Sequence, residues 1–300
     1  SAASDVYKRQ ECMEKEGARR CCHCRFNDTG SHRVRQVATW RRWRRRRRRP
    51  LYFAASSDPK TLDPAFASDG ESFRVTRQIM EGLVGTKPGT ADPAPLLAES
   101  WDTSKDGLSY TFHLKEGVKF HDGTDFNAEA VCANFDRWYN FTGIQQSEAV
   151  AYYYGKLFRG FKDKPEDAVY KSCEATDEKT AKVDLAQPFA GFVAALSLPA
   201  FSMQSPEAME KYNADKIGGS AEAPEMSEYA REHPTGTGPF KFEAWNPGQD
   251  IKLKYNEDYW GEKGQIDQIT FRVIDDPVAR KQSLDCLLYT SPSPRDATLS

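Results

Sequence analysis

Alternating hydrophobic and polar residues mark one strand of the chain clearly. Tyr110, Phe112 and Leu114 alternate with Thr111 and His113. This period of two is typical of a strand with one buried face, because successive side chains point to opposite sides of a sheet. The pattern predicts a half-buried β-strand over residues 110–114.

A helical period follows a short distance along the chain. Val131, Phe135 and Trp138 are spaced so that they share one face of an α-helix. Asn127 precedes them and is a good N-cap, because its side chain can accept a hydrogen bond from the first helical turn. The sequence therefore predicts an amphipathic helix that begins just after Asn127.

Further strand and helix patterns fill most of residues 51–285. Phe73, Ile79, Met80 and Leu83 lie near helical spacing and predict a second helix, and the polar stretch 221–233 predicts a surface excursion. Strands and helices mix without strict alternation and without an internal repeat, so we predict an α+β fold. The remaining predicted strands are residues 51–56, 180–185, 240–245, 251–255 and 268–273.

Composition excludes a fibrous chain and an integral membrane protein. The 300 residues are 39% hydrophobic and 12% aromatic. The longest apolar stretch, residues 189–203, is interrupted by Ser197 and Pro199 and is too short to cross a bilayer.

Charge separates the first fifty residues from the remainder. Residues 1–50 carry 16 Lys and Arg against 5 Asp and Glu, a net charge of +11, whereas residues 51–300 carry 26 against 39, a net charge of −13. The arginines at 41, 42 and 44–49 are typical of an arm that binds nucleic acid or an anionic membrane. They are also what a glycine-rich tether becomes when its DNA is read one base out of frame. The abrupt change of charge at Pro50 favours the frameshifted or disordered interpretation of residues 11–50.

The coding sequences of the two chain ends indicate a cloning artefact. One short oligonucleotide can encode residues 5–10, and its reverse complement encodes residues 286–291. We therefore expect residues 1–10 and 286–300 to be translated sequencing-library adaptors and not part of the natural fold.

Residues 95–101 read PLLAESW, and related stretches continue at residues 104–107, 110–118 and 120–123. This block resembles the signature of the family 5 extracellular solute-binding proteins, the dipeptide, oligopeptide and nickel receptors of bacterial ABC importers. Four further stretches agree in order and spacing, at residues 58–64 with 81–84, 236–245, 259–261 and 266–280.

The resemblance implies a periplasmic-binding-protein-like type II architecture. Residues 51–83 and 200–285 would form lobe I, and residues 84–199 would form the small extra lobe of this family. The third lobe, which closes over the ligand, would lie beyond this fragment.

The resemblance also implies function by hinge closure. A peptide ligand would bridge two lobes, and membrane permease subunits would recognise the closed form. The full-length receptor would be an extracytoplasmic, lipid-anchored monomer, with no nucleic-acid partner and no cofactor. Nickel chelates or sugars are the alternative ligands, and a nucleic-acid-binding protein that uses residues 41–49 is the alternative class. The segments expected to line the cleft are Phe66, Ala67, Ser68 and Asp69, with Phe201, Ser202 and Met203.

Two cysteines lie in the body of the chain. Cys132 falls on the predicted helix, and Cys173 falls just before a predicted strand. In an exported protein such a pair favours a disulfide that pins the small lobe, whereas two buried free thiols are the alternative.

Other candidate chemistry is weak. His113, His121 and His233 do not share metal-ligand spacing, and surface polar roles are expected for them. The stretch 236–239, GTGP, lacks the Gly-Lys-Ser/Thr ending of a phosphate loop and predicts a tight crossing into the next strand. Neither a Gly-x-Ser-x-Gly nor a His-Glu-x-x-His motif occurs, so we expect no catalytic residues and no metal site.

Overall fold

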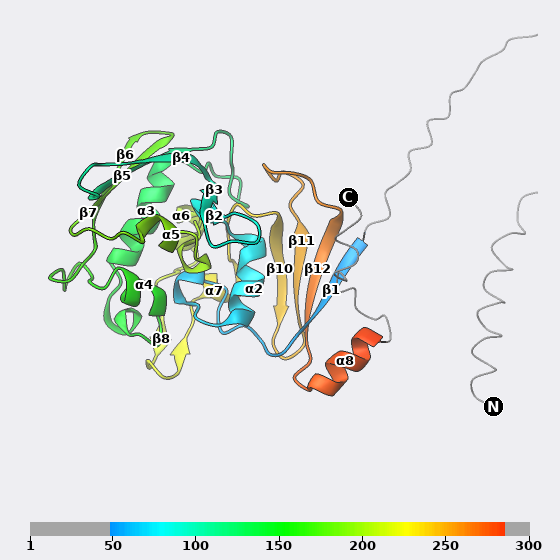
Figure 1. The fold of residues 1–300 in the computed structure, drawn as a ribbon. Coiled ribbons are helices and arrows are strands. Elements are labelled where there is room, and N and C mark those ends of the chain that lie inside the picture. The colour runs from blue at the N-terminus through cyan, green and yellow to red at the C-terminus, as the bar shows by residue number, and fades with distance from the viewer. Residues whose placement is uncertain (1–48, 286–300) are drawn as a thin grey trace, which may run out of the picture. The chain divides into compact units, whose positions relative to one another are not determined.

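The computed structural model describes residues 49–285, which form two four-stranded β-sheets with helices packed beside them (Figure 1). Strands and helices alternate irregularly along the chain. This arrangement confirms the predicted α+β class. Among the described helices, none combines the length and the apolar character that a membrane crossing needs.

The first sheet has the strand order β1-β12-β11-β10. β1 pairs with β12 in parallel, and the other two pairs are antiparallel. Ile251 and Leu253 on β11 lie opposite Phe271 and Ile269 on β12, and all four side chains are buried on one face of the sheet. The strands are β1 (Arg49–Ala55), β10 (Phe240–Asn246), β11 (Asp250–Tyr255) and β12 (Ile266–Val273).

The second sheet has the order β4-β5-β7-β6 and is antiparallel throughout. Burial alternates along β5 and β7, so that Tyr110, Phe112 and Leu114 point into the core as predicted. The strands are β4 (Ala98–Thr103), β5 (Ser109–Leu114), β6 (Tyr170–Asp177) and β7 (Thr180–Leu185).

Helix α3 (Ala128–Tyr139) packs against β6 and β7 of the second sheet. It begins where the sequence predicts, because the Asn127 side chain accepts a hydrogen bond from the backbone N–H of Ala130. Val131, Phe135 and Trp138 are each at most 1% exposed, so the predicted apolar face is the buried face.

Helical elements and two hairpins lie in the segments around the two sheets, and α8 follows the last strand. The helical elements are η1 (Pro64–Phe66), α2 (Gly70–Ile79), η2 (Gly143–Gln146), α4 (Tyr152–Leu157), α5 (Phe192–Ala195), η3 (Pro199–Phe201), α6 (Pro206–Lys211), α7 (Glu228–Glu232) and α8 (Pro277–Asp285). The two hairpins pair β2 (Val84–Thr86) with β3 (Pro93–Pro95) and β8 (Gly218–Gly219) with β9 (Pro224–Glu225).

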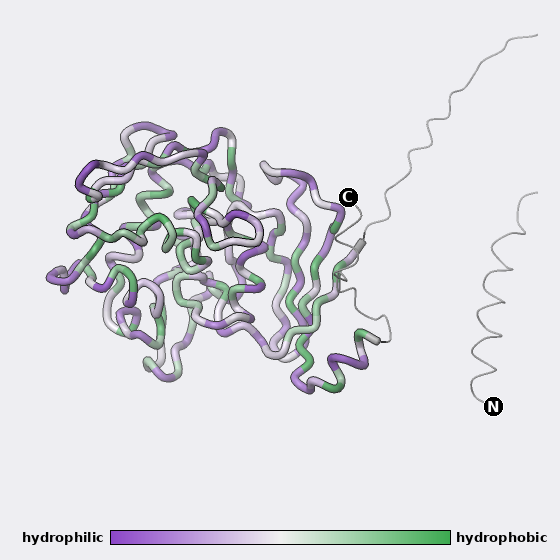
Figure 2. The backbone as a smooth tube through the Cα atoms, in the orientation of Figure 1, coloured by the Kyte–Doolittle hydropathy of each residue, from purple (hydrophilic) through white to green (hydrophobic). Residues whose placement is uncertain are grey.

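Two hydrophobic cores hold these elements together. The first core lies on the first sheet and includes Leu62, Ile79 and Tyr229. The second core is larger, fills the space between α3 and the second sheet, and also takes in Phe66 and Phe201. Green, hydrophobic residues follow both sheets and α3 in Figure 2, whereas many connecting loops are purple.

Several sequence-based boundaries need correction. β1 begins at Arg49, two residues earlier than predicted. Helix α2 ends at Ile79, because Met80 has extended backbone angles, and Leu83 therefore lies in the segment that crosses to the second core. The predicted surface excursion at 221–233 is exposed only in part, because Tyr229 on α7 is fully buried in the first core.

The predicted position of Cys173 also changes. Cys173 lies within β6, a strand whose mostly exposed residues gave no clear alternation. In the structure Cys173 forms a disulfide with Cys132 on α3, across a sequence separation of 41 residues. The disulfide thus joins α3 to β6, an edge strand of the second sheet.

Replacing both Cys132 and Cys173 by Ala should lower the free energy of unfolding by about 3–4 kcal/mol, because the cross-link restricts the unfolded chain. Urea unfolding followed by circular dichroism measures the change. Glu174→Gln, which alters an exposed neighbour on β6, is the control and should unfold like the unaltered chain. Equal stability of the double-alanine chain and the control would contradict a stabilising cross-link.

Candidate functional site

The carboxyl ends of β1 and β12 lie together, because these two strands are parallel neighbours. In open α/β sheets, ligands bind in the crevice outside the carboxyl ends of parallel strands, and β1 and β12 form the parallel pair of this mixed sheet. The first turn of α2 reaches the same edge, since the Ser56 hydroxyl donates to Glu71 Oε1 over 2.6 Å. We call this surface at the strand ends the strand-end shelf. It is formed by Phe53, Ser56, Ser68 and residues 69–74.

The shelf is built around a well-capped helix start. Asp69 is the N-cap of α2, and its carboxylate accepts from the backbone N–H of Ser72 at 2.9 Å and from its hydroxyl at 2.7 Å. Ser72 in turn accepts from the backbone N–H of Lys60 at 2.9 Å. These bonds fix the loop after β1 against the first turn of α2.

Glu71 and Arg74 form an ion pair on the shelf. Burial acts to raise the pKa of Glu71, but the hydrogen bonds from Arg74 and Ser56 outweigh it and hold that pKa below its usual value. Glu71 is therefore an anion near neutral pH, and it fixes one side of the Arg74 guanidinium.

The predicted ligand segment Phe66–Asp69 lies only partly on this surface. Ser68 is exposed and Asp69 is half-buried. Phe66 and Ala67 are 4% and 1% exposed, and the Phe66 ring packs on Phe141 with centroids 4.8 Å apart. Of this segment, Ser68 is the side chain most open to a ligand.

The second predicted segment is buried at the boundary between the two cores. Phe201, Ser202 and Met203 are at most 4% exposed, and Phe201 packs against Trp138 of α3 with centroids 5.3 Å apart. Ser202 borders a hollow of about 650 Å³, which Glu81 and other residues also line. The segment therefore supports the boundary between the cores, and of its residues Ser202 alone lines this hollow.

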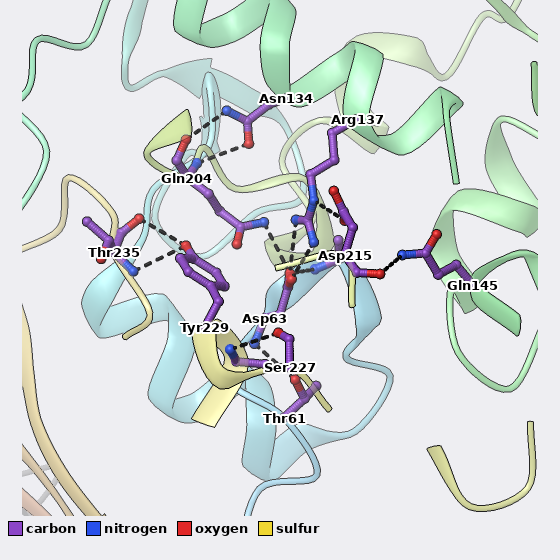
Figure 3. A network of polar contacts seen from close by, with 12 residues as sticks. Thr61, Asp63, Asn134, Arg137, Gln145, Gln204, Asp215, Ser227, Tyr229 and Thr235 are labelled. Carbon is purple, nitrogen blue, oxygen red and sulfur yellow. Dashed lines mark hydrogen bonds and ion pairs between the residues drawn. The ribbon is translucent and has the colours of Figure 1, made fainter. Parts of the chain in front are cut away.

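A buried ion pair that sequence reasoning missed joins the two cores (Figure 3). The guanidinium of Arg137 on α3 donates from Nη2 to Asp63 Oδ2 and from Nε to Asp215 Oδ1, each over 2.7 Å. The Asp63 side chain is fully buried, and that of Arg137 is 5% exposed. Burial acts to lower the pKa of Arg137, but the charges of Asp63 and Asp215 raise it above its ordinary value.

Amides and hydroxyls complete this network. Asn134 exchanges two hydrogen bonds with the backbone of Gln204, and the Gln204 side chain donates to Asp63 at 3.2 Å (Figure 3). Beside it, the Tyr229 hydroxyl and the backbone of Thr235 exchange hydrogen bonds of 3.2 Å. No local signal in the sequence indicated this network, because Arg137 lies beside the predicted apolar face of the helix and not on it.

Glu81 forms a second polar junction at the end of the chain crossing from α2. Its Oε1 accepts from the Tyr259 hydroxyl at 2.7 Å, and its Oε2 accepts from Trp260 Nε1 and from the Thr237 hydroxyl, each at 2.8 Å. Burial raises the pKa of Glu81, and these hydrogen bonds with the charge of Lys115 offset only part of the rise.

The glycines at 236–238 make a tight crossing, as the sequence predicts. A Cβ on Gly238 would lie 2.7 Å from the backbone of Ile79, so a larger residue would push the loop off the end of α2. His121 also reaches this loop, and its Nε2 lies 2.8 Å from the Gly238 carbonyl oxygen. Because a carbonyl only accepts, Nε2 carries the proton.

The histidines do not gather into one site. His113 pairs with Asp102 at 2.9 Å, and His233 stacks on Tyr212 with ring centroids 3.6 Å apart. Burial lowers the pKa of His121 to about 4, and this half-buried side chain bonds to the Gly238 carbonyl oxygen. Within residues 49–285, no group of three potential metal-ligating side chains is present.

Comparison with known proteins identifies relatives over most of the described region. The sequence pattern described as Bacterial extracellular solute-binding proteins, family 5 Middle, matches residues 92–285. Glutathione-binding protein GsiB of Salmonella typhi is 36% identical over 233 residues, which are 77% of this chain and 39% of that protein. The chain thus spans less than half the length of this curated relative.

Solved structures agree with the sequence match. DppA from Helicobacter pylori, in complex with the peptide STSA, superposes with a TM-score of 0.66 and 34% identity over 83% of this chain and 48% of DppA. NikA from Brucella suis, in complex with Fe(III)-EDTA, superposes with a TM-score of 0.60 and 30% identity over 79% of this chain and 42% of NikA.

Glu81 should make stability depend on pH. Its folded-state pKa is raised above the ordinary value of 4.5, so the folded chain holds a proton that the unfolded chain releases. The stabilising contribution is therefore present below pH 4.5 and is lost as pH rises through the folded-state pKa.

Glu81→Gln should remove this loss, because Gln keeps the shape of the neutral acid and does not ionise. Relative to the unaltered chain, its free energy of unfolding should rise between pH 4.5 and 7.5, as measured by urea unfolding at several pH values. Glu174→Gln on β6 is the exposed control and should follow the unaltered chain. A constant difference between Glu81→Gln and the unaltered chain across this range would contradict the assignment.

Proposed function

Because this chain belongs to the bacterial extracellular solute-binding proteins of family 5, we propose that it is part of a peptide receptor that serves an ABC importer. The observation that carries the proposal is the strand-end shelf. There the parallel strands β1 and β12 end beside a rigidly capped helix start, with Ser68 exposed. This is where open sheets bind ligands.

The two cores supply one half of a clamp in this proposal. Residues 51–83 and 200–285 form lobe I, and residues 84–199 form the small extra lobe. Phe66, Phe201 and Met203 cross the boundary and pack in the second core. A third lobe closes over the shelf. It corresponds to a part of the longer relatives that this chain does not span.

Ligand binding then acts by population shift. A ligand that contacts both the shelf and the facing lobe stabilises the closed form by its differential affinity for that form. Permease subunits of the importer recognise this form. The full-length protein is an extracytoplasmic, lipid-anchored monomer that captures its ligand and does not transform it.

Peptides are the favoured ligand class. GsiB is named for glutathione, which is itself a tripeptide, and DppA was solved with a peptide. An extended peptide offers backbone groups to strand ends, and hydrated pockets accept varied side chains. Nickel chelates and sugars are the alternative ligands, and NikA, which was solved with Fe(III)-EDTA, is a relative that binds a metal chelate.

Isothermal titration calorimetry on the full-length protein tests the proposal, with di- and tripeptides, glutathione, a nickel chelate and a disaccharide as ligands. Peptide binding is expected. Ser68→Trp should weaken it at least tenfold, because the indole would occupy the shelf. Thr103→Trp, on an exposed position of β4, is the matched control and should bind like the unaltered protein.

Two results would refute the proposal. One is binding of the chelate or the disaccharide with no peptide binding. The other is equal peptide affinity in Ser68→Trp and Thr103→Trp, which would remove the shelf from the ligand site.

A further inference from the structure

Arg74 is held in one orientation on the strand-end shelf. Its Nη1 pairs with Glu71, and its Cζ lies 4.7 Å from the centroid of the Phe53 ring. The Ser56 hydroxyl holds Glu71 from the opposite side at 2.6 Å. A guanidinium stacked on an aromatic ring and paired on one side has lost much of its rotamer freedom before any ligand arrives.

Both partners in this stack remain accessible. The Arg74 side chain is 38% exposed, and Phe53 is 37% exposed. Phe53 also contacts Phe271 of the first core, with ring centroids 5.7 Å apart, so packing against the core holds the Phe53 ring in place. The donors of Arg74 other than Nη1 are thus presented from a rigid base.

Other carboxylates near the shelf are occupied. Asp58 accepts from Trp245 Nε1 at 2.9 Å and from the backbone N–H of Gly248 at 2.7 Å. Asp69 accepts with both oxygens from Ser72. Of these three carboxylates, Glu71 forms the ion pair with Arg74.

The same chain shows that one guanidinium serves two carboxylates. Arg137 binds Asp63 through Nη2 and Asp215 through Nε. The edges of a guanidinium form separate forks, so a second carboxylate does not displace the first.

We propose that Arg74 binds a carboxylate group of the ligand, with Phe53 and Glu71 as positioning residues. This inference rests on the proposed peptide-binding function and deepens it, because it makes the shelf selective for acidic ligands. In a peptide the carboxylate is either the C-terminus or an acidic side chain.

Three matched tripeptides distinguish these sources by calorimetry on the full-length protein. They are trialanine with a free C-terminus, trialanine amide, and Ala-Glu-Ala amide. The free acid should bind about 10–100-fold more tightly than trialanine amide, the range expected for a charge-assisted hydrogen bond. If Arg74 binds acidic side chains instead, Ala-Glu-Ala amide should bind more tightly than trialanine amide by a similar factor. Tighter binding of either carboxylate-bearing peptide supports a carboxylate site.

Arg74→Gln should abolish the gain, so that the free acid and trialanine amide bind with equal affinity. Arg74→Lys keeps the charge but lacks the planar fork, so it should retain part of the gain. Arg77→Gln, one turn along α2 and exposed, is the control and should retain all of it. Melting temperatures within a few degrees of the unaltered protein show that these variants fold.

The outcomes separate this inference from the function on which it rests. If the unaltered protein binds all three tripeptides equally, or if the gain survives in Arg74→Gln, the inference is overturned and peptide binding stands. If none of the three binds the unaltered protein, the proposed function fails and the inference fails with it.

Discussion

The buried pair between Asp63 and Arg137 is the constraint on which the joining of the two cores depends. A charge taken out of water is tolerated only when a partner and hydrogen bonds replace its hydration. Asp63 lies just before η1, in the segment that leads from β1 to α2, whereas Arg137 lies on the helix that covers the second sheet. Neither core can move away from the other without leaving one of these charges buried and alone.

This joint explains why the shelf can serve as a rigid surface. The loop that carries Asp63 continues into Ser68 and the first turn of α2, so the ion pair between Asp63 and Arg137 anchors the segment that forms the shelf. Glu81 braces the far end of α2, where three donors from the 237 and 259–260 segments converge on it. The shelf is therefore already ordered before a ligand binds. The conformational entropy of its side chains and loop was lost on folding, so binding does not have to order them.

Local patterns predicted the elements better than the contacts between them. The alternation at residues 110–114 and the apolar face from Val131 to Trp138 depend on neighbours along the chain, so both could be predicted. β6 was missed because it is an edge strand with mostly exposed residues. Tyr229 was predicted to lie on the surface because α7 is short and mostly charged, so the sequence gives no clear pattern of one buried face.

The site was only partly predictable for the same reason. The family motifs pointed to Ser68 and Asp69, which lie on the shelf, but also to Phe201 and Met203, which are buried in the second core. The partners of Arg137 are 74 and 78 residues away in the sequence, and no local pattern shows which carboxylate reaches a buried arginine. The expected adaptor sequences at residues 1–10 and 286–300, and the expected frameshifted or disordered segment up to residue 48, lie outside the described residues.

Native-state hydrogen exchange on Arg137→Met tests most directly whether the two cores form one unit. In the unaltered chain, core amides of both sheets should open together, with the same free energy. In Arg137→Met the two sheets should open separately, and global stability should fall by about 3–5 kcal/mol, because Asp63 is left buried without its partner. If Arg137→Met keeps a common opening and matches the exposed control Arg231→Met in stability, the buried pair does not join the cores.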